Sequence, residues 1–178
     1  MSDALADRRT AQLRLGRITL RDLSDIERMQ VDPQTMATLG GVRDARQTQR
    51  MVEAWVAHWD AHGFGLWIAR DAASGDFAGR GGLQHTVVGG RPEVEVAYGL
   101  LPAFWGRGLA TELAEASVRA AFAELRLPDL VCFTLTTNLA SQRVMEKAGF
   151  AFEGEVEHAG LPHLLYRLRA STWRDRAE

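Results

Sequence analysis

The chain has 178 residues, of which 46% are hydrophobic and 25% charged, a composition typical of one globular domain and not of a disordered chain. Its 21 basic and 23 acidic residues leave a net charge of −2, which predicts no general attraction to nucleic acid or to an anionic membrane. No apolar run reaches the roughly 18 residues of a membrane-spanning helix. Residues 1–10 and the tail from Arg174 are polar, so we expect both segments to be loose and expect no secretory signal. The single cysteine excludes an internal disulfide.

The first part of the chain predicts one strand followed by three helices. Residues 13–18 carry the apolar positions of a strand, and residues 19–22 have the form of a helix-capping box, with an acid three residues after a threonine. Asp32-Pro33 places a proline near the first position of a second short helix. Residues 45–62 predict a long amphipathic helix that stops at Gly63. Its apolar stripe consists of Thr48, Met51, Val52, Trp55, Val56 and Trp59.

The middle of the chain changes to the two-residue period of strands. Residues 66–69, 77–88 and 93–101 predict three strands, joined by a turn at 71–76 and by the hairpin signal Gly89-Gly90. We expect these strands to form an antiparallel meander.

The last part predicts helices alternating with strands. A helix is expected over 109–125, a central apolar strand over 130–136, and a second helix over 138–148. Residues 150–156 and 164–168 predict the last two strands. The order of elements indicates a mixed α/β fold.

A glycine-rich loop at the start of the 109–125 helix is the first candidate site. Its sequence is Trp105-Gly106-Arg107-Gly108-Leu109-Ala110-Thr111. Glycines let a backbone approach a ligand closely, and the free N–H groups and positive dipole of a helix N-terminus favour phosphate. The loop can therefore bind a phosphate group, to which Arg107 would add charge. The alternative is a turn into a helix without a ligand.

Two phosphate-binding motifs fit this loop poorly. A Walker loop requires Gly-Lys-Ser/Thr after its spacers, and that run is absent. A dinucleotide fingerprint needs three glycines directly after a first strand, whereas here Thr111 takes the third position and a meander precedes the loop. Asp129, the candidate ribose acid, starts a strand instead of ending one.

Residues 107–110 match the acyl-CoA pyrophosphate loop Q/R-x-x-G-x-G/A, with Trp105 in place of its leading Gln/Arg. Residues 98–112 are similar to the run Gly-Tyr … Pro … Trp-Gly-Lys-Gly … Ala-Thr-Glu, although Ala97 stands where glycine is usual. In both features the chain resembles the RimJ/RimL-like branch of the GNAT superfamily of N-acetyltransferases.

A second segment carries the same resemblance. Residues 138–150 are similar to the branch's Asn-x-x-Ser-x-x-Val … Lys-x-Gly-Phe segment. Taken structurally, Asn138 is a helix N-cap and Gly149-Phe150 is a C-cap followed by a core aromatic residue. The resemblance covers about residues 12–173, which we expect to be the ordered core.

The resemblance implies a GNAT fold, a mixed and mostly antiparallel twisted sheet of about six to seven strands flanked by helices, in a single acyltransferase domain over residues 1–178. Strands 93–101 and 130–137 would splay apart and admit the pantetheine arm of acetyl-CoA, the acyl donor. The residues implied in binding acetyl-CoA are Leu100, Leu101, Trp105, Gly106, Arg107, Gly108, Leu109, Ala110, Thr111, Asn138, Ser141 and Arg143.

The reaction implied is direct attack of a substrate amine on acetyl-CoA. An amine is nucleophilic only when neutral, and alkylammonium pKa values lie near 10, so a base must accept a proton. Glu95 matches the glutamate of the branch's Glu-Ile-Gly-Tyr run and is the candidate base. Strand alternation places Glu93, a candidate acceptor contact, on the same face, where the two carboxylates would raise each other's pKa. The alternative is a pair of solvated acids.

The reaction also needs a general acid that protonates the departing thiolate. Met145 stands where related N-terminal acetyltransferases have a tyrosine, so Ser141 is the candidate acid.

The remaining candidates are the histidines and the cysteine. His58 and His62 have the helical spacing of zinc ligands, but no carboxylate or third ligand accompanies them in a motif, so we expect no metal. His85 and His163 are candidate acceptor contacts. Cys132 lies in an apolar strand and is expected to be inert core.

Taken together, these features predict a cytoplasmic, acetyl-CoA-dependent N-acetyltransferase. The resemblance favours a protein or peptide N-terminal α-amine, such as that of a ribosomal protein, as the acceptor. Acetylation of a small-molecule amine, a non-catalytic acyl-CoA-binding domain, and a nucleotide-binding oxidoreductase that would use NAD(P) are the alternatives. We expect no nucleic-acid or membrane partner, and a homodimer is compatible with the fold.

Overall fold

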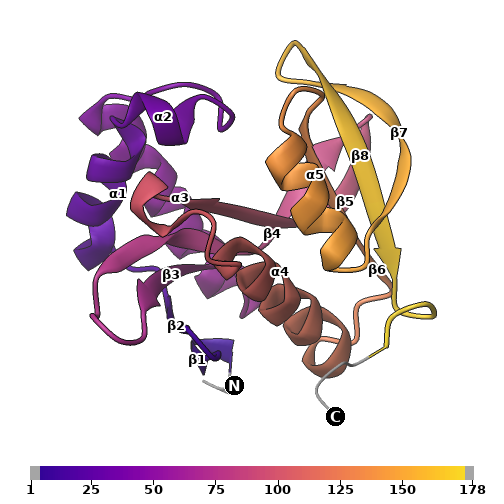
Figure 1. Cartoon of the computed structure of the whole chain (residues 1–178), viewed down its shortest axis with the longest axis horizontal. Coiled ribbons are helices and arrows are strands. Elements are labelled where there is room, and N and C mark those ends of the chain that lie inside the picture. The colour runs from indigo at the N-terminus through magenta and orange to yellow at the C-terminus, as the bar shows by residue number, and fades with distance from the viewer. Residues whose placement is uncertain (1–4, 175–178) are drawn as a thin grey trace.

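A single sheet organises the computed structural model, which describes residues 5–174 (Figure 1). Its neighbour order is β1-β2-β3-β4-β5-β6-β8-β7, and every neighbouring pair is antiparallel except β5–β6. The strands are β1 (Asp7–Arg9), β2 (Leu13–Arg17), β3 (Leu66–Asp71), β4 (Phe77–Val88), β5 (Arg91–Leu100), β6 (Asp129–Leu135), β7 (Ala151–His158) and β8 (Leu161–Arg169). The mixed α/β fold and the central meander are confirmed, with eight strands instead of six to seven.

The extra strand is β1, in a segment that we expected to be loose. Residues 7–9 pair with residues 14–16 of β2 at the sheet edge, and the Arg8 side chain binds Glu124 at 2.5 Å. Charged residues are common on edge strands because they discourage pairing with another chain, which explains why the apolar pattern gave no signal. Residues 1–4 and 175–178, the rest of the two segments expected to be loose, lie outside the described residues.

Five α-helices accompany the sheet in the described part of the chain: α1 (Leu23–Gln30), α2 (Pro33–Met36), α3 (Ala45–His62), α4 (Leu109–Arg119) and α5 (Leu139–Lys147). The capping box over residues 19–22 is present ahead of α1, on a short 3-10 turn. α3 has the predicted bounds because Asp44 caps its start and Gly63, with φ of 72°, ends it. The predicted 109–125 helix continues beyond α4 as a π-helix over Ala120–Glu124. None of these helices is long and apolar enough to cross a membrane.

Helices pack on both faces of the sheet. On one face, a Cβ added to Gly99 would lie 2.9 Å from Met29 of α1. On the other, a Cβ added to Gly81 would lie 2.6 Å from Leu113 of α4. Successive residues of a strand point to opposite faces, so the residues of β5 alternate between the sheet face that carries α1 and the face that carries α4.

The central strands β5 and β6 run parallel but share a single paired position, Glu95 with Val131. β4 pairs with β5 along its whole length, and β8 does the same for β6. Beyond Glu95, β5 therefore has a strand neighbour on its β4 side alone among the described residues. Cys132 Sγ donates to the Val96 carbonyl at 3.0 Å, just where the strands part. The predicted splay is confirmed, and Cys132 is buried as expected.

Candidate active site

Glu95 lies at the point where β5 and β6 separate, and its side chain is buried. Gln84 of β4 donates to Glu95 Oε2 at 2.9 Å. Burial raises the pKa of the Glu95 carboxyl, while the Gln84 hydrogen bond and the charge of Arg80 oppose the rise. A carboxylate held in a poorly solvated place with a raised pKa is suited to accept a proton near neutral pH.

Glu93 does not contribute to this environment in the way that we expected. Its carboxylate pairs with Arg167 at 2.8 Å, and the same guanidinium binds Asp129 at 2.8 Å and Glu153 at 2.6 Å. The expectation that the two acids act on one another is wrong for Glu95, whose pKa is raised by burial and not by Glu93. Glu93 is instead one of three acids around a single arginine.

Arg80 is a component of the site that the sequence analysis did not identify. It is buried on β4, and its guanidinium lies 5.2 Å from the centre of the Trp55 ring of α3. Burial lowers the pKa of Arg80 to about 10, and its Nε has no hydrogen-bond partner among the described residues. The sequence does contain a feature that could have identified Arg80, because it is the one charged residue in the run from residue 77 to residue 83.

A hydroxyl pair lies on the opposite face of β5. Tyr98 OH is 2.8 Å from Ser141 Oγ and donates to the Ser141 carbonyl at 3.2 Å. Burial raises the pKa of Tyr98, so the phenol is protonated and can donate. Strand alternation explains this arrangement, since Tyr98 and Glu95 are three residues apart and point to opposite faces.

Asn138 is the N-cap of α5, as the structural interpretation predicted. Its Oδ1 accepts from the Ser141 N–H at 3.1 Å, and its Nδ2 donates to Thr134 Oγ1 at 3.0 Å. These bonds fix the first turn of α5 beside the end of β6 and thereby orient Ser141. Arg143, further along α5, is exposed.

The glycine-rich loop leads into an uncapped helix N-terminus. Gly106 and Gly108 have φ of 74° and 77°, a left-handed conformation that favours glycine, and an added Cβ would meet no atom within 4 Å at either position. Gly108 is the N-cap of α4 and offers no side-chain hydrogen bond. Open space and the free N–H groups of a first helical turn meet here, which is the arrangement that binds an anion.

Two side chains of the loop bind back to the protein. The Trp105 Nε1–H donates to the Leu100 carbonyl at 2.8 Å. Arg107 pairs with Asp71 at 2.5 Å and lies 5.6 Å from the centre of the Phe104 ring. These contacts hold the loop against the end of β5. They also direct the Arg107 charge toward Asp71, so the backbone N–H groups carry more of the anion site than we expected.

The two histidines assigned to acceptor contact lie in different places. His85, near the end of β4, meets His58 and His62 of α3. His163 is near the β7–β8 hairpin, where its Nδ1 contacts the Leu161 carbonyl at 2.9 Å. The structure does not bring the pair together.

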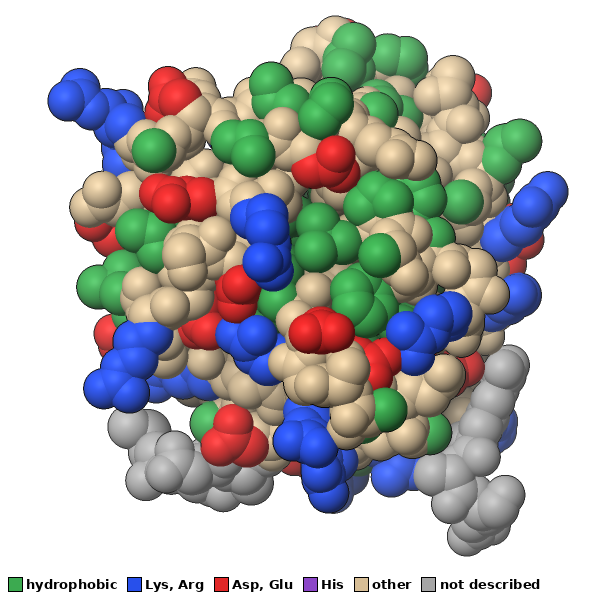
Figure 2. Space-filling model, turned by 60° about the vertical axis from the view of Figure 1, so that its left-hand side comes forward, with side chains coloured by type: hydrophobic (Ala, Val, Ile, Leu, Met, Phe, Trp, Pro, Cys, Tyr) green, Lys and Arg blue, Asp and Glu red, His purple; other side chains and the backbone are tan. Residues whose placement is uncertain are grey.

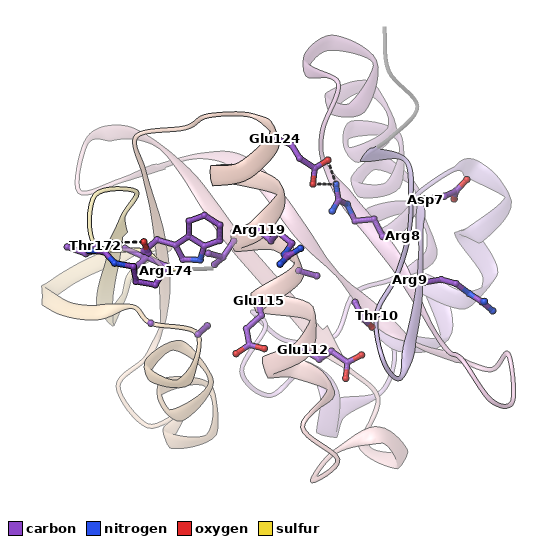
Figure 3. A pocket seen from close by; sticks show the side chains of 16 residues that line it. Asp7, Arg8, Arg9, Thr10, Glu112, Glu115, Arg119, Glu124, Thr172 and Arg174 are labelled. Carbon is purple, nitrogen blue, oxygen red and sulfur yellow. Dashed lines mark hydrogen bonds and ion pairs between the residues drawn. The ribbon is translucent and has the colours of Figure 1, made fainter. Parts of the chain in front are cut away.

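A hollow of about 820 Å³ lies between the β1–β2 hairpin, α4 and the segment after β8 (Figure 3). Figure 3 shows Glu112, Glu115 and Arg119 on α4, with Arg8 turned toward Glu124 across the hollow. None of the candidate site residues lines it. We therefore do not assign the reaction to this hollow.

The face brought forward in Figure 2 carries basic and acidic side chains interspersed with one another, without a large field of either sign. This distribution agrees with the small net charge of −2. That face has no electrostatic footprint of a nucleic-acid-binding surface.

Comparison with known proteins gives one family. The family model described as "Acetyltransferase (GNAT) domain" matches residues 12–151. A structure of an acetyltransferase from Agrobacterium tumefaciens superposes with a TM-score of 0.81 at 25% identity, covering 95% of this chain and 97% of that one.

Two curated proteins are similar in sequence to this chain. The uncharacterized protein YkkB of Bacillus subtilis is 28% identical over 160 residues, 86% of this chain and 93% of that protein. The FsC-acetyl coenzyme A-N(2)-transacetylase of Aspergillus fumigatus is 30% identical over 131 residues, 68% of this chain and 55% of that protein.

Proposed function

Because the chain belongs to the GNAT acetyltransferase family and is an acetyl-CoA-dependent N-acetyltransferase, we propose that it acetylates the N-terminal α-amine of a protein or peptide, with Glu95 as the base. The observation that carries this assignment of the base is the burial of Glu95 where β5 and β6 part. No other site residue combines a carboxylate, burial and a raised pKa at the splay.

The donor is assigned to the splay and the glycine-rich loop. The N–H groups of Gly108, Leu109 and Ala110, with the open space above the glycines, suit its pyrophosphate. Beyond Glu95, the side of β5 that faces away from β4 has no strand neighbour among the described residues. This free edge suits the pantetheine arm, which would run beside Leu100. We also assign the remaining loop residues, Leu101 and Asn138 to donor binding.

The proposed reaction is direct transfer within a ternary complex. The neutral amine nitrogen forms a bond to the thioester carbonyl carbon, and the C–S bond breaks. Glu95 accepts the proton that the amine loses, directly or through one water. Ser141, whose Oγ is held by Tyr98 OH 2.8 Å away, donates a proton to the departing thiolate. Solvent then takes the proton from Glu95 and returns one to Ser141, which completes the cycle. Backbone N–H groups of the splayed β5 stabilise the oxyanion.

Replacing Ser141 with alanine should lower kcat about tenfold, which is below the usual 10²- to 10⁴-fold of general acids because a thiol of pKa near 8.5 leaves readily. The KM for acetyl-CoA should change little. Tyr98→Phe should give a smaller loss, since Ser141 keeps its own hydroxyl. Steady-state kinetics with thiol release as the signal measures each effect. If Ser141→Ala keeps the wild-type kcat, another group protonates the thiolate.

The acceptor assignment rests on the two RimJ/RimL-like segments, residues 98–112 and 138–150. We place the chain in that branch and the reaction in the cytoplasm, where protein N-termini of this kind are found. The alternative acceptor is another kind of amine. It is favoured by the relative whose name describes acetyl transfer to an N(2) position of FsC.

A panel of acceptors tests this assignment. Peptides with free N-termini, the same peptides blocked at the N-terminus but carrying lysine, and small amines would be compared at equal concentration with acetyl-CoA. We expect acetylation of the free N-terminal peptides with kcat/KM at least tenfold above every other class. Mass spectrometry locates the acetyl group. Faster turnover of a small amine would overturn the acceptor class while leaving the acetyltransferase assignment intact.

A further inference from the structure

Three histidines meet beside the C-terminal turn of α3. His58 and His62 lie four residues apart on the helix, and His85 comes from β4. The ring centres are 4.6 Å apart for His58–His62, 5.2 Å for His58–His85 and 4.4 Å for His62–His85. One ligand nitrogen from each ring falls within 4.8 Å of the other two.

The hydrogen bonds of His58 fix its ring and its tautomer. Its Nδ1 contacts the Phe64 carbonyl at 2.9 Å, and because a carbonyl only accepts, Nδ1 carries the proton. Nε2 is therefore the acceptor nitrogen, and it accepts from the backbone N–H of His85 at 3.1 Å, a hydrogen bond that a metal ion bound at Nε2 would replace. A histidine whose second nitrogen donates to a carbonyl is the usual form of a metal ligand.

The spacing fits a metal ion. His58 Nε2 and His85 Nδ1 are 3.0 Å apart. A tetrahedral zinc ion, with Zn–N distances of about 2.0–2.1 Å, separates its nitrogens by about 3.3 Å. The ion would replace the His58–His85 hydrogen bond, and the nitrogen of His62, which lies within 4.8 Å of the other two, would move closer to them.

We propose that His58, His62 and His85 form a binding site for one zinc ion, with water as the fourth ligand. The four-residue helix spacing was visible in the sequence, and His85 is the third ligand that it lacked. His62 and His85 are exposed, so an ion can enter from solvent. This assignment replaces the expectation that the chain binds no metal.

The proposed ion would tie α3 to β4. The cluster lies where β4 continues past the start of β3, which pairs from Leu66 with Gly82. His85 directly follows Gln84, the residue that donates to Glu95. A bound zinc ion would therefore fix the edge of β4 next to the candidate active site, as a structural link that takes no part in acetyl transfer.

The test uses the untagged full chain, first stripped with a chelator. Titration with Co²⁺, a spectroscopic stand-in for Zn²⁺, should give the visible absorption of a tetrahedral site that saturates at one ion per chain. Zn²⁺ should displace Co²⁺ and abolish the signal. A saturating excess of Zn²⁺ should raise Tm by about 5 °C. These readouts do not depend on acetyl transfer.

Matched histidine variants distinguish the cluster from scattered surface binding. His62→Gln leaves the His58–Phe64 contact in place and should weaken Zn²⁺ binding about tenfold or more, as should His85→Gln. His163→Gln, which alters a histidine outside the cluster, should bind like wild type. Absence of the tetrahedral signal in the wild type, or wild-type affinity in both cluster variants, would overturn the proposal.

Discussion

Replacing Glu95 with glutamine should lower kcat by about 10²- to 10⁴-fold, the range found for general acid–base groups. Glutamine keeps the shape and can still bond to Gln84, but it cannot accept the amine proton. The affinity for acetyl-CoA should stay within about twofold, because the donor is assigned to the glycine-rich loop and to β5 beyond Glu95, and no donor contact is assigned to the Glu95 carboxylate. Steady-state kinetics and calorimetric titration with acetyl-CoA measure the two quantities.

The role of Glu95 as a base also predicts how kcat/KM depends on pH. A base acts only when ionised, so kcat/KM should fall as the pH drops through the pKa of Glu95. Burial raises that pKa, so the acidic limb should lie above the ordinary glutamate value of 4.5. The limb should be absent in Glu95→Gln.

The same substitution, Glu95→Gln, should not lower the stability of the protein, although it lowers kcat. A carboxyl whose pKa is raised by folding destabilises the folded state once the pH exceeds its unfolded pKa, because the ionised form is penalised. Glu95→Gln should therefore unfold at the same or a higher temperature than wild type at neutral pH.

The matched control for the kinetic prediction is Glu155→Gln, which alters an exposed acid on β7 and should leave kcat unchanged. If Glu95→Gln turns over at the wild-type rate, Glu95 is not the base.

Replacing Gly108 with aspartate should weaken acetyl-CoA binding about tenfold or more, because the new carboxylate would repel the pyrophosphate. Two like charges about 4 Å apart repel by about 1 kcal/mol in water and by about 4 kcal/mol near a protein surface. Gly108 has a left-handed backbone, which aspartate tolerates better than most residues. The added side chain points into open space and displaces no protein atom. The fold should survive, and the loss should fall on the donor.

Gly108→Asn separates charge from shape. Asparagine has nearly the size of aspartate and the same tolerance of the left-handed region, but it is neutral. We expect most of the affinity to return in Gly108→Asn, and the aspartate effect to shrink as salt rises. Calorimetric titration with CoA gives both values. Equal weakening by the two variants would indicate a steric effect, and no weakening would remove this loop from the pyrophosphate site.

Much of the fold follows from local signals. The bounds of α3 match the prediction because Asp44 and Gly63 cap and stop the helix within the segment itself. The β4–β5 hairpin follows from its two glycines and the two-residue period of its strands. Such signals act between residues close in the chain, where the alternatives are few.

The site was harder to predict because its contacts join distant segments. Tyr98 and Ser141 are 43 residues apart, and His58 and His85 are 27 apart. The local pattern shows that each is polar and on which face of its element it lies, but not what it meets. Arg80 was overlooked for a related reason, because the Trp55 ring that it meets belongs to a distant segment, α3.

The single paired position between β5 and β6 has a consequence for the whole sheet. With the donor arm lying beside β5 as proposed, it acts as a removable strand that completes the sheet. The cohesion between the β1–β5 and β6–β8 parts would then depend on how much donor is bound, because a ligand stabilises the state that binds it. The cellular supply of CoA and its acetyl ester would thus govern the rigidity of this protein as well as its turnover.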